Sequence, residues 1–439
     1  MKKSNVVLII VLVFLVAAAW GMYLMRGMST IQDRNVQMQQ AEKYNEKALY
    51  QKAIACYDAI LGQKESKTVR ELWVEAYENA YNDGAIERKQ YAKSLDQMCT
   101  LYPEDTIYWE KLLSLYIDNQ DFNNAYKCFT KCEREGVESE KIAEYGKTIL
   151  YTYSLRGRSY VEFICSTEGY YTVFTGEEWG VLDAAGDSVY ENIYEYISPY
   201  SSTNIALFVS GEKQRIMNEE EVIEEKLNIN FLKTGTYVDG LMAVCAEDGT
   251  WKYLDCETNS YLQGTYEQAS NFADGVAAVC KNGSWTLVNT NEEQICQTVF
   301  SDIKLHKNGD YQYDGVMVAA VNGEYGFYNE KGETLAEFKA KDMDVYLGGN
   351  VAFADASGKW GFVDKSGEVA MEPQFAQAKS FANKLAAVGN GEVWGFVNKT
   401  GEVVIDQQFV DTGYFTAEGT CMVSLQEGQY NLLILKFVD

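Results

Sequence analysis

The sequence predicts an α+β multidomain protein, in which a transmembrane helix and a helical repeat segment precede an all-β domain that closes into a β-propeller of about eight blades. Three observations support this prediction. A unit of about 35 residues recurs through the last two thirds of the chain. Near residue 157 the composition changes from apolar residues at helical spacing to β-rich runs between glycine turns. An uncharged, mostly apolar run fills residues 4–25, so that the predicted domains are residues 1–27, 30–156 and 158–439.

One aromatic position anchors each repeat of the β domain. It is occupied by Trp179, Trp251, Trp285, Tyr325, Trp360, Trp394 and Tyr430, which we predict to be structural core residues and not the rim of a sugar-binding site. The gaps between them are 72, 34, 40, 35, 34 and 36 residues. Because the first gap is about twice the others, we expect a further unit inside it, with Gln214 at the aromatic position.

Two kinds of turn divide each unit into short strands. The first is an Asn-Gly or Asp-Gly pair, beginning at Asp248, Asn282, Asn322 and Asn390. Such pairs accept positive φ angles at low cost and favour tight hairpins. The second places Asp or Asn three residues before Gly, as in Asp364 and Gly367, which suits a type I turn with a bulge. Each unit is therefore predicted to be a three-stranded meander, with a fourth short strand near residues 272–275 or 381–384.

The repeated Trp-Gly-Phe-Val sequence gives the unit its family resemblance. It occurs at Trp360 and at Trp394, each time followed by Asp or Asn and then by a glycine turn. This pattern resembles the WG containing repeat of bacterial proteins, closely over residues 351–406, moderately over 240–335 and weakly over 160–230 and 410–439. The resemblance implies a repeat scaffold and brings no catalytic residues with it.

The two ends of the β domain indicate how it closes. Residues 160–173 align with residues 409–423, so the domain opens with the strand that ends a unit and stops partway through its last unit. We therefore expect the strand at residues 160–165 to complete the blade formed by residues 420–436. An open β-solenoid is the alternative and would need polar caps, whereas the chain ends on the apolar run of residues 432–435.

The N-terminal segment is predicted to cross a membrane. Residues 4–25 are long enough for a transmembrane helix, with Lys2 and Lys3 before it and Arg26 after it. A cleaved signal peptide, with the small residues 17–19 at the cleavage site, is the alternative. The apolar run continues past that site, which favours an uncleaved signal anchor. The short basic tail then lies in the cytoplasm, and the bulk of this single-pass cell-membrane protein lies outside it.

Residues 30–156 have apolar residues at helical spacing. Trp109, Leu112 and Tyr116, followed by Ala125 and Phe129, fit a pair of antiparallel helices. Their pattern resembles the tetratricopeptide repeat, and the positions equivalent to residue 125 fall at 53 and 91, close to its period of about 34 residues. The resemblance is degenerate, and a generic helical bundle is the alternative.

Charge limits the partners of the β domain. Residues 157–439 hold 18 basic and 43 acidic residues, whereas residues 1–156 hold 20 and 21. Nucleic acid and anionic lipid both require cationic neutralisation, so neither is an expected partner of this domain. The acidic surface is interpreted as a means of solubility, although a cationic partner or divalent ions would also be attracted to it.

The residue types of common catalytic and metal sites are scarce. His306 is the only histidine, which excludes a site with several histidines, and the following Lys-Asn-Gly predicts a surface loop for it. The ten cysteines form no Cys-x-x-Cys pair and suggest neither a zinc site nor a disulfide framework. Cys128 and Cys132 are predicted to be buried thiols, and Cys245 and Cys280 to occupy equivalent strand positions. No catalytic residue, metal ligand or cofactor is predicted.

These observations predict a membrane-anchored protein of the bacterial cell envelope that is not an enzyme. It would bind or scaffold a protein partner through its helical and WG repeats, with one N-terminal span in the membrane. A carbohydrate-binding or sensor protein of the envelope is the alternative. An enzyme that uses acidic residues at the propeller mouth is a further alternative.

Overall fold

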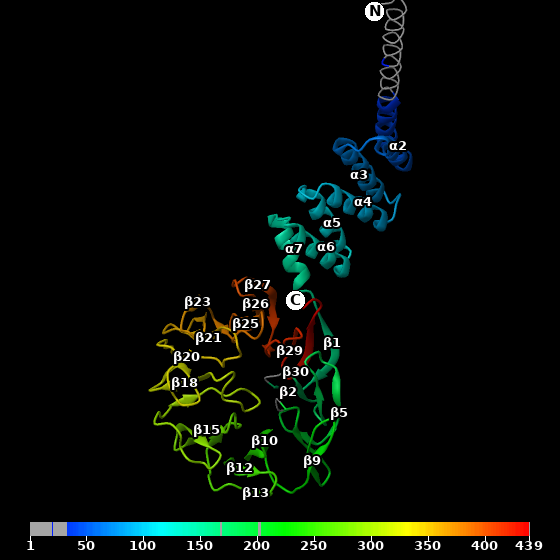
Figure 1. The fold of residues 1–439 in the computed structure, drawn as a ribbon. Coiled ribbons are helices and arrows are strands. Elements are labelled where there is room, and N and C mark those ends of the chain that lie inside the picture. The colour runs from blue at the N-terminus through cyan, green and yellow to red at the C-terminus, as the bar shows by residue number, and fades with distance from the viewer. Residues whose placement is uncertain (1–19, 21–32, 167–168, 201–202, 439) are drawn as a thin grey trace, which may run out of the picture. The chain divides into compact units, whose positions relative to one another are not determined.

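The computed structural model describes residue 20 and residues 33–166, 169–200 and 203–438. Within these residues the chain forms two compact units, which divide between Ile149 and Leu150 (Figure 1). The predicted transmembrane segment, residues 4–25, lies outside the described residues except for Trp20. In the part of the chain that is described, no helix has both the length and the apolar character needed to cross a membrane.

The first unit consists of seven helices in its described part, joined by loops of a few residues so that neighbours run antiparallel (Figure 1). The first covers residues 33–46, and the others are α2 (Tyr50–Gln63), α3 (Lys67–Asn82), α4 (Arg88–Leu101), α5 (Thr106–Asp118), α6 (Phe122–Glu135) and α7 (Glu140–Leu150).

The residues that repeat along the helical unit lie in its core. Ala53, Tyr91 and Ala125, which occupy the predicted repeat position, are all buried. Trp109 is fully buried, and its indole N–H donates a hydrogen bond to the carbonyl of Pro103 at 3.0 Å. This bond satisfies a polar group that burial would otherwise leave unpaired.

Ion pairs link successive helix pairs at the same period. They join Lys67 to Asp105 at 2.6 Å, Lys111 to Glu78 at 2.6 Å, Lys131 to Asp96 at 2.9 Å and Arg88 to Asp121 at 3.0 Å. Each pair is partly exposed and contributes little to stability by itself. Their spacing of 33 to 38 residues shows that they join a helix, or the residue that caps it, to the helix two further along the chain.

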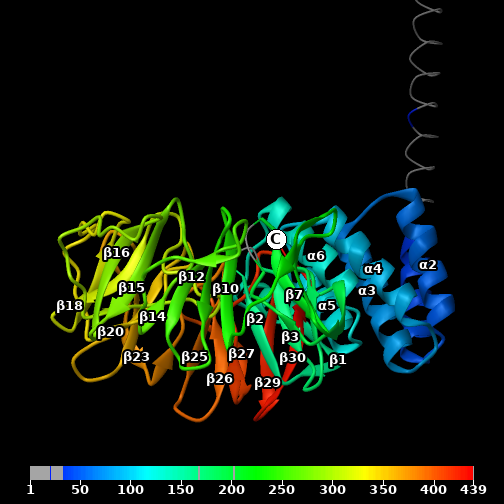
Figure 2. The ribbon, with the colours of Figure 1, turned by 90° about the horizontal axis from the view of Figure 1, so that it is seen from below.

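The second unit is an eight-bladed β-propeller in its described residues, as predicted (Figures 1 and 2). Blade 1 consists of β2 (Glu162–Cys165), β3 (Tyr171–Phe174), β4 (Trp179–Leu182) and β5 (Ser188–Tyr194), and blade 2 of β6 (Tyr196–Ile197), β7 (Ala206–Ser210), β8 (Lys213–Met217) and β9 (Val222–Leu227). Blade 3 consists of β10 (Lys233–Val238), β11 (Leu241–Cys245), β12 (Trp251–Asp255) and β13 (Ser260–Tyr261). Blade 4 consists of β14 (Gln268–Ala269), β15 (Val276–Lys281) and β16 (Ser284–Asn289).

Blades 5 to 8 follow the same antiparallel order. Blade 5 consists of β17 (Asp302–Ile303), β18 (Met317–Val321) and β19 (Glu324–Tyr328), and blade 6 of β20 (Asp342–Met343), β21 (Val351–Ala354), β22 (Trp360–Val363) and β23 (Val369–Phe375). Blade 7 consists of β24 (Gln377–Ala378), β25 (Ala386–Gly389), β26 (Trp394–Val397) and β27 (Val403–Phe409). Blade 8 consists of β28 (Asp411–Thr412), β29 (Thr420–Gln426), β30 (Gln429–Leu435) and β1 (Tyr153–Tyr160).

The propeller core is distributed between the blades and not gathered at one centre. One cluster of buried apolar side chains lies between each pair of neighbouring blades. The middle strands β21 and β25 are buried on both faces, because a blade packs against each side of them. In β21, alanine alternates with valine and phenylalanine, which suits this close sheet packing. Each blade therefore depends on two neighbours.

The ring closes as predicted, but with a different strand. β1 pairs with β30, in the register Leu155 to Leu433 and Tyr160 to Tyr430, and completes blade 8 (Figure 1). Tyr160 takes the place opposite the repeat aromatic that Phe409 takes in blade 7. The expectation that residues 160–165 would close the ring was wrong beyond Tyr160, because β2 is the innermost strand of blade 1. Repeat alignment located the equivalent position correctly, but the closing strand precedes it.

The glycine of the Trp-Gly pair is required by the neighbouring strand. The outer strands β23 and β27 shift register beside Gly361 and Gly395, which brings their backbone close. A Cβ at Gly361 would lie 2.5 Å from the carbonyl oxygen of Met371, and one at Gly395 would lie 2.5 Å from that of Ile405. The motif therefore contains glycine because the backbone of the outer strand lies too close to leave room for a side chain.

The turns agree with the predictions in part. Asn282 and Asn322, with the glycines that follow them, have positive φ angles, as expected for tight hairpins. At Asp248 and Asn390 only the glycine that follows has a positive φ angle, because the loop between the two strands is longer there. The fourth strand was placed wrongly: β14 and β24 precede residues 272–275 and 381–384, which form the turn leading into the next strand.

Candidate functional site

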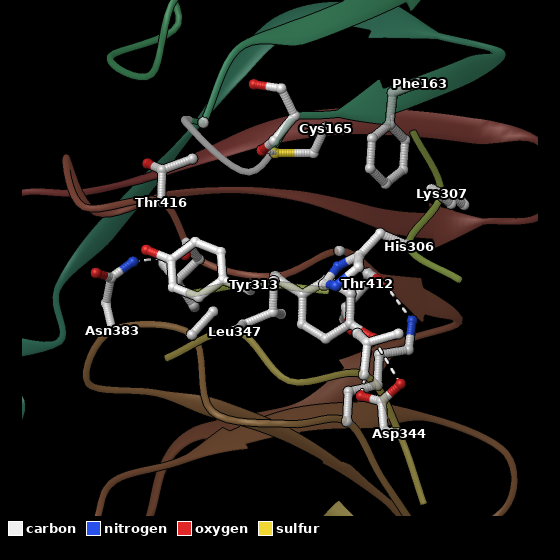
Figure 3. Close-up of a pocket in the computed structure, with 18 of the residues that line it drawn as sticks. Phe163, Cys165, His306, Lys307, Tyr313, Asp344, Leu347, Asn383, Thr412 and Thr416 are labelled. Carbon is white, nitrogen blue, oxygen red and sulfur yellow. Dashed lines mark hydrogen bonds between the residues drawn. The ribbon is translucent and has the colours of Figure 1, made fainter. Parts of the chain in front are cut away.

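A cavity of about 370 Å³ lies among the innermost strands of the propeller (Figure 3). Its wall comes from blades 1, 5, 6, 7 and 8, whose first strands and the loops after them converge there. Phe163 and Cys165 lie on one side, and Asp344 lies across the cavity from them (Figure 3). Leu347 and Phe415 add apolar surface, so that the cavity combines apolar walls with a few charged groups, as ligand sites do.

A turn from blade 5 reaches into this space. Residues 304–316 connect β17 to β18, whereas only residues 379–385 connect the equivalent strands of blade 7. Within the longer connection, the amide of His306 donates to Asp310 and the amide of Gly309 donates back to His306. The turn carries Lys307 across to blade 1, where its ammonium lies 4.2 Å from the centre of the Phe163 ring.

Blade 4 holds this turn in place. The side-chain amide of Asn271 donates to the carbonyl of Asn308 at 2.8 Å and to the carboxylate of Asp310 at 2.7 Å. Its backbone N–H donates to the carbonyl of Gly309 at 2.8 Å. Asn271 and Asn308 are both 2% exposed, so these bonds are shielded from water. The turn is thus a fixed part of the cavity wall.

The prediction of a surface loop for His306 was wrong. The local turn was expected correctly, but the turn points into the ring and His306 lines the cavity. Burial lowers the pKa of His306, and the nearby carboxylates of Asp310 and Asp344 only partly offset this effect. The imidazole is therefore neutral at neutral pH.

Lysine–aspartate pairs connect the innermost strands of neighbouring blades. Lys379 of blade 7 lies 3.0 Å from the carboxylate of Asp411 in blade 8 and also donates to the carbonyl of Thr412. Lys304 of blade 5 lies 2.9 Å from Asp342 of blade 6. Each pair joins the innermost strands of two adjacent blades.

Asp411 shows how the wall keeps a half-buried carboxylate ionised. Burial would raise the pKa of Asp411, but the ammonium of Lys379 and the hydroxyl of Tyr430, which donates at 2.7 Å, outweigh it and hold the pKa below its usual value. The carboxylate therefore stays ionised at neutral pH.

Asp344 is satisfied in the same way from two other blades. The hydroxyl of Tyr414 lies 2.8 and 2.9 Å from the two oxygens of Asp344 (Figure 3). The backbone amide of Ser380 donates to the same carboxylate at 2.6 Å. Burial, reinforced by this carboxylate, raises the pKa of Tyr414 well above its usual value, so its hydroxyl remains a donor.

Of the two lysines in the cavity wall, Lys307 is the one that forms no ion pair with a described carboxylate. Its ammonium lies over the rings of Phe163, at 4.2 Å, and Tyr430, at 5.9 Å, as a cation–π contact. Burial lowers its pKa, although the carboxylate of Asp411 acts in the opposite direction.

The thiols near the cavity are poor nucleophiles. Burial raises the pKa of Cys165 to about 12 and raises that of Cys421 as well. A thiol with such a pKa is protonated at neutral pH and unreactive. Cys128 and Cys132 are buried as predicted, Cys245 and Cys280 lie buried in the second strands of blades 3 and 4, and all ten cysteines are free.

Among the described residues no group of three or more His, Cys, Asp or Glu side chains has the arrangement of a metal site. Near the cavity, His306 faces Asp310 and Asp344, but Asp344 already accepts hydrogen bonds from Tyr414 and Ser380.

The predicted anchor residues lie outside the cavity wall and do not converge on one site. Each stands at the start of the third strand of its own blade: Trp179, Trp251, Trp285, Tyr325, Trp360, Trp394 and Tyr430. Trp179 and Trp285 are buried and the others are half-buried. In three blades a lysine covers the exposed ring face, as Lys379 does over Trp394 at 5.0 Å.

Gln214 stands at the aromatic position of blade 2, as predicted. Its side-chain amide donates to the carbonyl of Ile229 at 2.8 Å and accepts from the N–H of the same residue at 2.9 Å. Glutamine here imitates a strand backbone, which explains how a polar residue can fill a position that is aromatic elsewhere.

Sequence inspection missed the cavity residues but contained a signal for them. The gap of 40 residues between Trp285 and Tyr325 is the longest between neighbouring anchors, and the extra residues form the turn that carries His306 and Lys307. An insertion in one unit of a repeat array is a usual place for function.

Comparison with known families supports the repeat assignment. The family model described as WG containing repeat matches residues 262–285, 360–393 and 394–430. The propeller therefore contains WG repeats between residues 262 and 430. The resemblance of the helical unit to the tetratricopeptide repeat has no such match and stays a prediction.

Other comparisons add little. No curated protein matches the chain. Among solved structures, the crystal structure of BamB from Moraxella catarrhalis matches with 12% sequence identity and a TM-score of 0.38, covering 64% of this chain and 96% of that one. The fold assignment rests on the strand pairing described above.

Proposed function

We propose that the chain is a membrane-anchored protein of the bacterial cell envelope that acts as a protein-binding scaffold. Residues 4–25 would hold it in the cell membrane as a single span, with the bulk of the chain outside the cytoplasm. The helical unit would recruit a protein partner, and the WG-repeat propeller would provide a rigid platform.

The use of repeated residues for packing carries this proposal. Trp109 and Ala125 pack inside the helical unit, and Phe362 and Phe396 pack inside the propeller. Exposed residues such as Leu101 and Ile107 are not part of this core and are free to contact a partner. Repeat proteins recognise partners with variable surface residues on a constant frame.

Binding, and not catalysis, is proposed for the propeller as well. Its cavity carboxylates are held by partners from neighbouring blades: Asp411 by Lys379, and Asp344 by Tyr414. A catalytic acid or base has to be free to exchange a proton with substrate, whereas these groups serve the contacts between blades.

Capture of partners from detergent-solubilised membranes tests the scaffold role. On the helical unit, Leu101 and Ile107 are exposed apolar residues at the end of α4 and the start of α5. The double variant Leu101→Glu, Ile107→Glu should lose partners that the full chain captures. The matched variant Val222→Glu, Ile223→Glu changes two exposed apolar residues of the propeller and should keep them. Identical partners for both variants would contradict a role for this part of the helical unit.

Two measurements test the proposed location. The mature protein should retain residues 4–25 and fractionate with membranes, so an N-terminal sequence that starts at Trp20 would contradict the anchor. A cysteine introduced at exposed Val222 should react with an impermeant thiol reagent in intact cells. Protection of that cysteine until the membrane is broken would place the propeller in the cytoplasm instead.

A further inference from the structure

The central cavity contains one lysine, Lys307, that forms no ion pair or hydrogen bond with the described residues. Lys379 is paired with Asp411 at 3.0 Å, and Asp344 accepts hydrogen bonds from Tyr414 and Ser380. Lys307 contacts only aromatic faces: within the described residues no oxygen accepts a hydrogen bond from its ammonium. Because part of the Lys307 side chain is exposed, its three N–H donors are open to water or to a ligand that enters the cavity.

The backbone that carries this lysine is fixed before any ligand arrives. Its turn is clamped by Asn271, which bonds Asn308, Gly309 and Asp310. A Cβ at Gly309 would lie 3.1 Å from the Asn271 side chain, and the φ angle of Gly309 is +95°, so glycine is needed there. Such preorganisation reduces the entropy that a bound ligand would otherwise have to overcome.

The rest of the wall defines what accompanies the charge. Phe163, Leu347 and Phe415 give apolar surface, and Tyr313 adds an aromatic face. Thr416 and neutral His306 supply polar groups at the margin. A volume of about 370 Å³ holds a small molecule and not a folded partner.

We propose that the central cavity of the propeller binds a small organic carboxylate with an apolar or aromatic body, and that Lys307 holds the carboxylate group. Burial lowers the pKa of Lys307, and an anion beside it would restore the environment that a charged ammonium prefers. The aromatic walls would cover the body of the ligand.

The charges of the cavity wall favour a singly charged anion over a dianionic or a cationic ligand. A phosphate dianion usually needs several cationic or amide donors, and the fixed carboxylates of Asp344 and Asp411 would repel its second charge. A cationic ligand would meet Lys307 and Lys379, while both carboxylates are already engaged. The site is independent of partner binding by the helical unit, so either proposal can fail without the other.

Three probes of one size test the proposal by isothermal titration calorimetry on the full chain. They are 4-hydroxyphenylacetate, its neutral amide and the cationic amine tyramine. The carboxylate should bind at least about tenfold more tightly than the amide or the amine, since it alone can pair with Lys307. Equal binding of carboxylate and amide, or no binding of the carboxylate, would overturn the proposal.

Variants assign the preference to one side chain. Lys307→Met keeps a flexible chain over the Phe163 ring and should abolish the difference between carboxylate and amide, whereas Lys307→Arg should retain it. Lys233→Met is the matched control, because Lys233 also lies over a ring, that of Trp251 at 5.4 Å, but outside the cavity wall. A carboxylate preference that survives in Lys307→Met, or disappears in Lys233→Met, would contradict the assignment.

Discussion

The helical unit and the propeller are both built from repeats, but they end differently. Each helix pair contacts the next through side chains 33 to 38 residues apart, and the array then stops. The propeller has no end, since β1 pairs with β30 and an apolar cluster fills the junction of blades 8 and 1 like the other junctions. Loss of one contact should therefore act locally in the helical unit and on every blade in the propeller.

The largest effect should follow from removing the closing strand. A chain that lacks residues 430–439 loses most of β30, the strand between β1 and β29. Every blade should then lose protection in amide hydrogen exchange, including β15 and β18, which lie in other blades. A chain that ends at Leu435 keeps β30 and should remain protected. Persistent protection of β15 and β18 in the shorter chain would show that the ring does not unfold as one unit.

A substitution that creates a cavity in the helical unit tests whether the two units unfold independently. Trp109→Ala removes a fully buried side chain and should destabilise this unit by about 3–5 kcal/mol. In hydrogen exchange, helices α5 and α6 should open first, while the propeller strands keep the protection of the unchanged chain. Equal loss of protection in both units would mean that they unfold together.

A single methyl group should disturb the ring. Gly395→Ala places a Cβ against the backbone of the outer strand β27 and should destabilise the propeller by about 1–3 kcal/mol. The whole β transition should shift in thermal unfolding, without a separate early step. Gly157→Ala is the control, because a Cβ there meets no atom within 4 Å. If both variants melt at the same temperature, the close approach at Gly395 has no energetic consequence.

The smallest effect concerns how the free energy of unfolding depends on acidic pH. The folded-state pKa of Asp411 lies below its usual value, so its contribution is present at neutral pH and is lost as the pH falls through that pKa. The unchanged chain should therefore lose more unfolding free energy between pH 6 and pH 3 than Asp411→Asn does. The difference should be below about 1 kcal/mol, because the side chain is 38% exposed and water screens the pair.

A control for this measurement is Asp187→Asn, which removes a 2.9 Å contact with Arg156 at a site that is 72% exposed. Its acid dependence should match that of the unchanged chain more closely. A steeper acid loss in Asp411→Asn than in the unchanged chain would reverse the sign and reject the assigned role of Lys379.

The number of blades could be predicted because local chemistry repeats. Each aromatic anchor and each glycine turn is set by strand geometry within its own blade, so spacing alone located the blades, including the one at Gln214. The closing strand was missed because β1 repeats little of the motif: only Tyr160 matches the equivalent position.

The cavity could not be predicted because its residues meet only through ring closure. Lys307 belongs to blade 5, Phe163 to blade 1, and the clamp Asn271 to blade 4. Turn chemistry correctly indicated a turn at His306, but nothing local says whether a turn points away from a ring or into it. The direction is set by contacts across the ring.

The pairing of Tyr160 with Tyr430 also has a consequence for synthesis. A ribosome makes β1 before any other strand of the propeller, and it makes the partner strand β30 after all the others. The helical unit can fold as it emerges, since its contacts are between near neighbours in sequence, whereas blade 8 stays incomplete until the other seven blades have been made. Until then β1 is an unpaired strand edge that can join other chains. Premature termination should therefore produce aggregating chains and not shorter propellers.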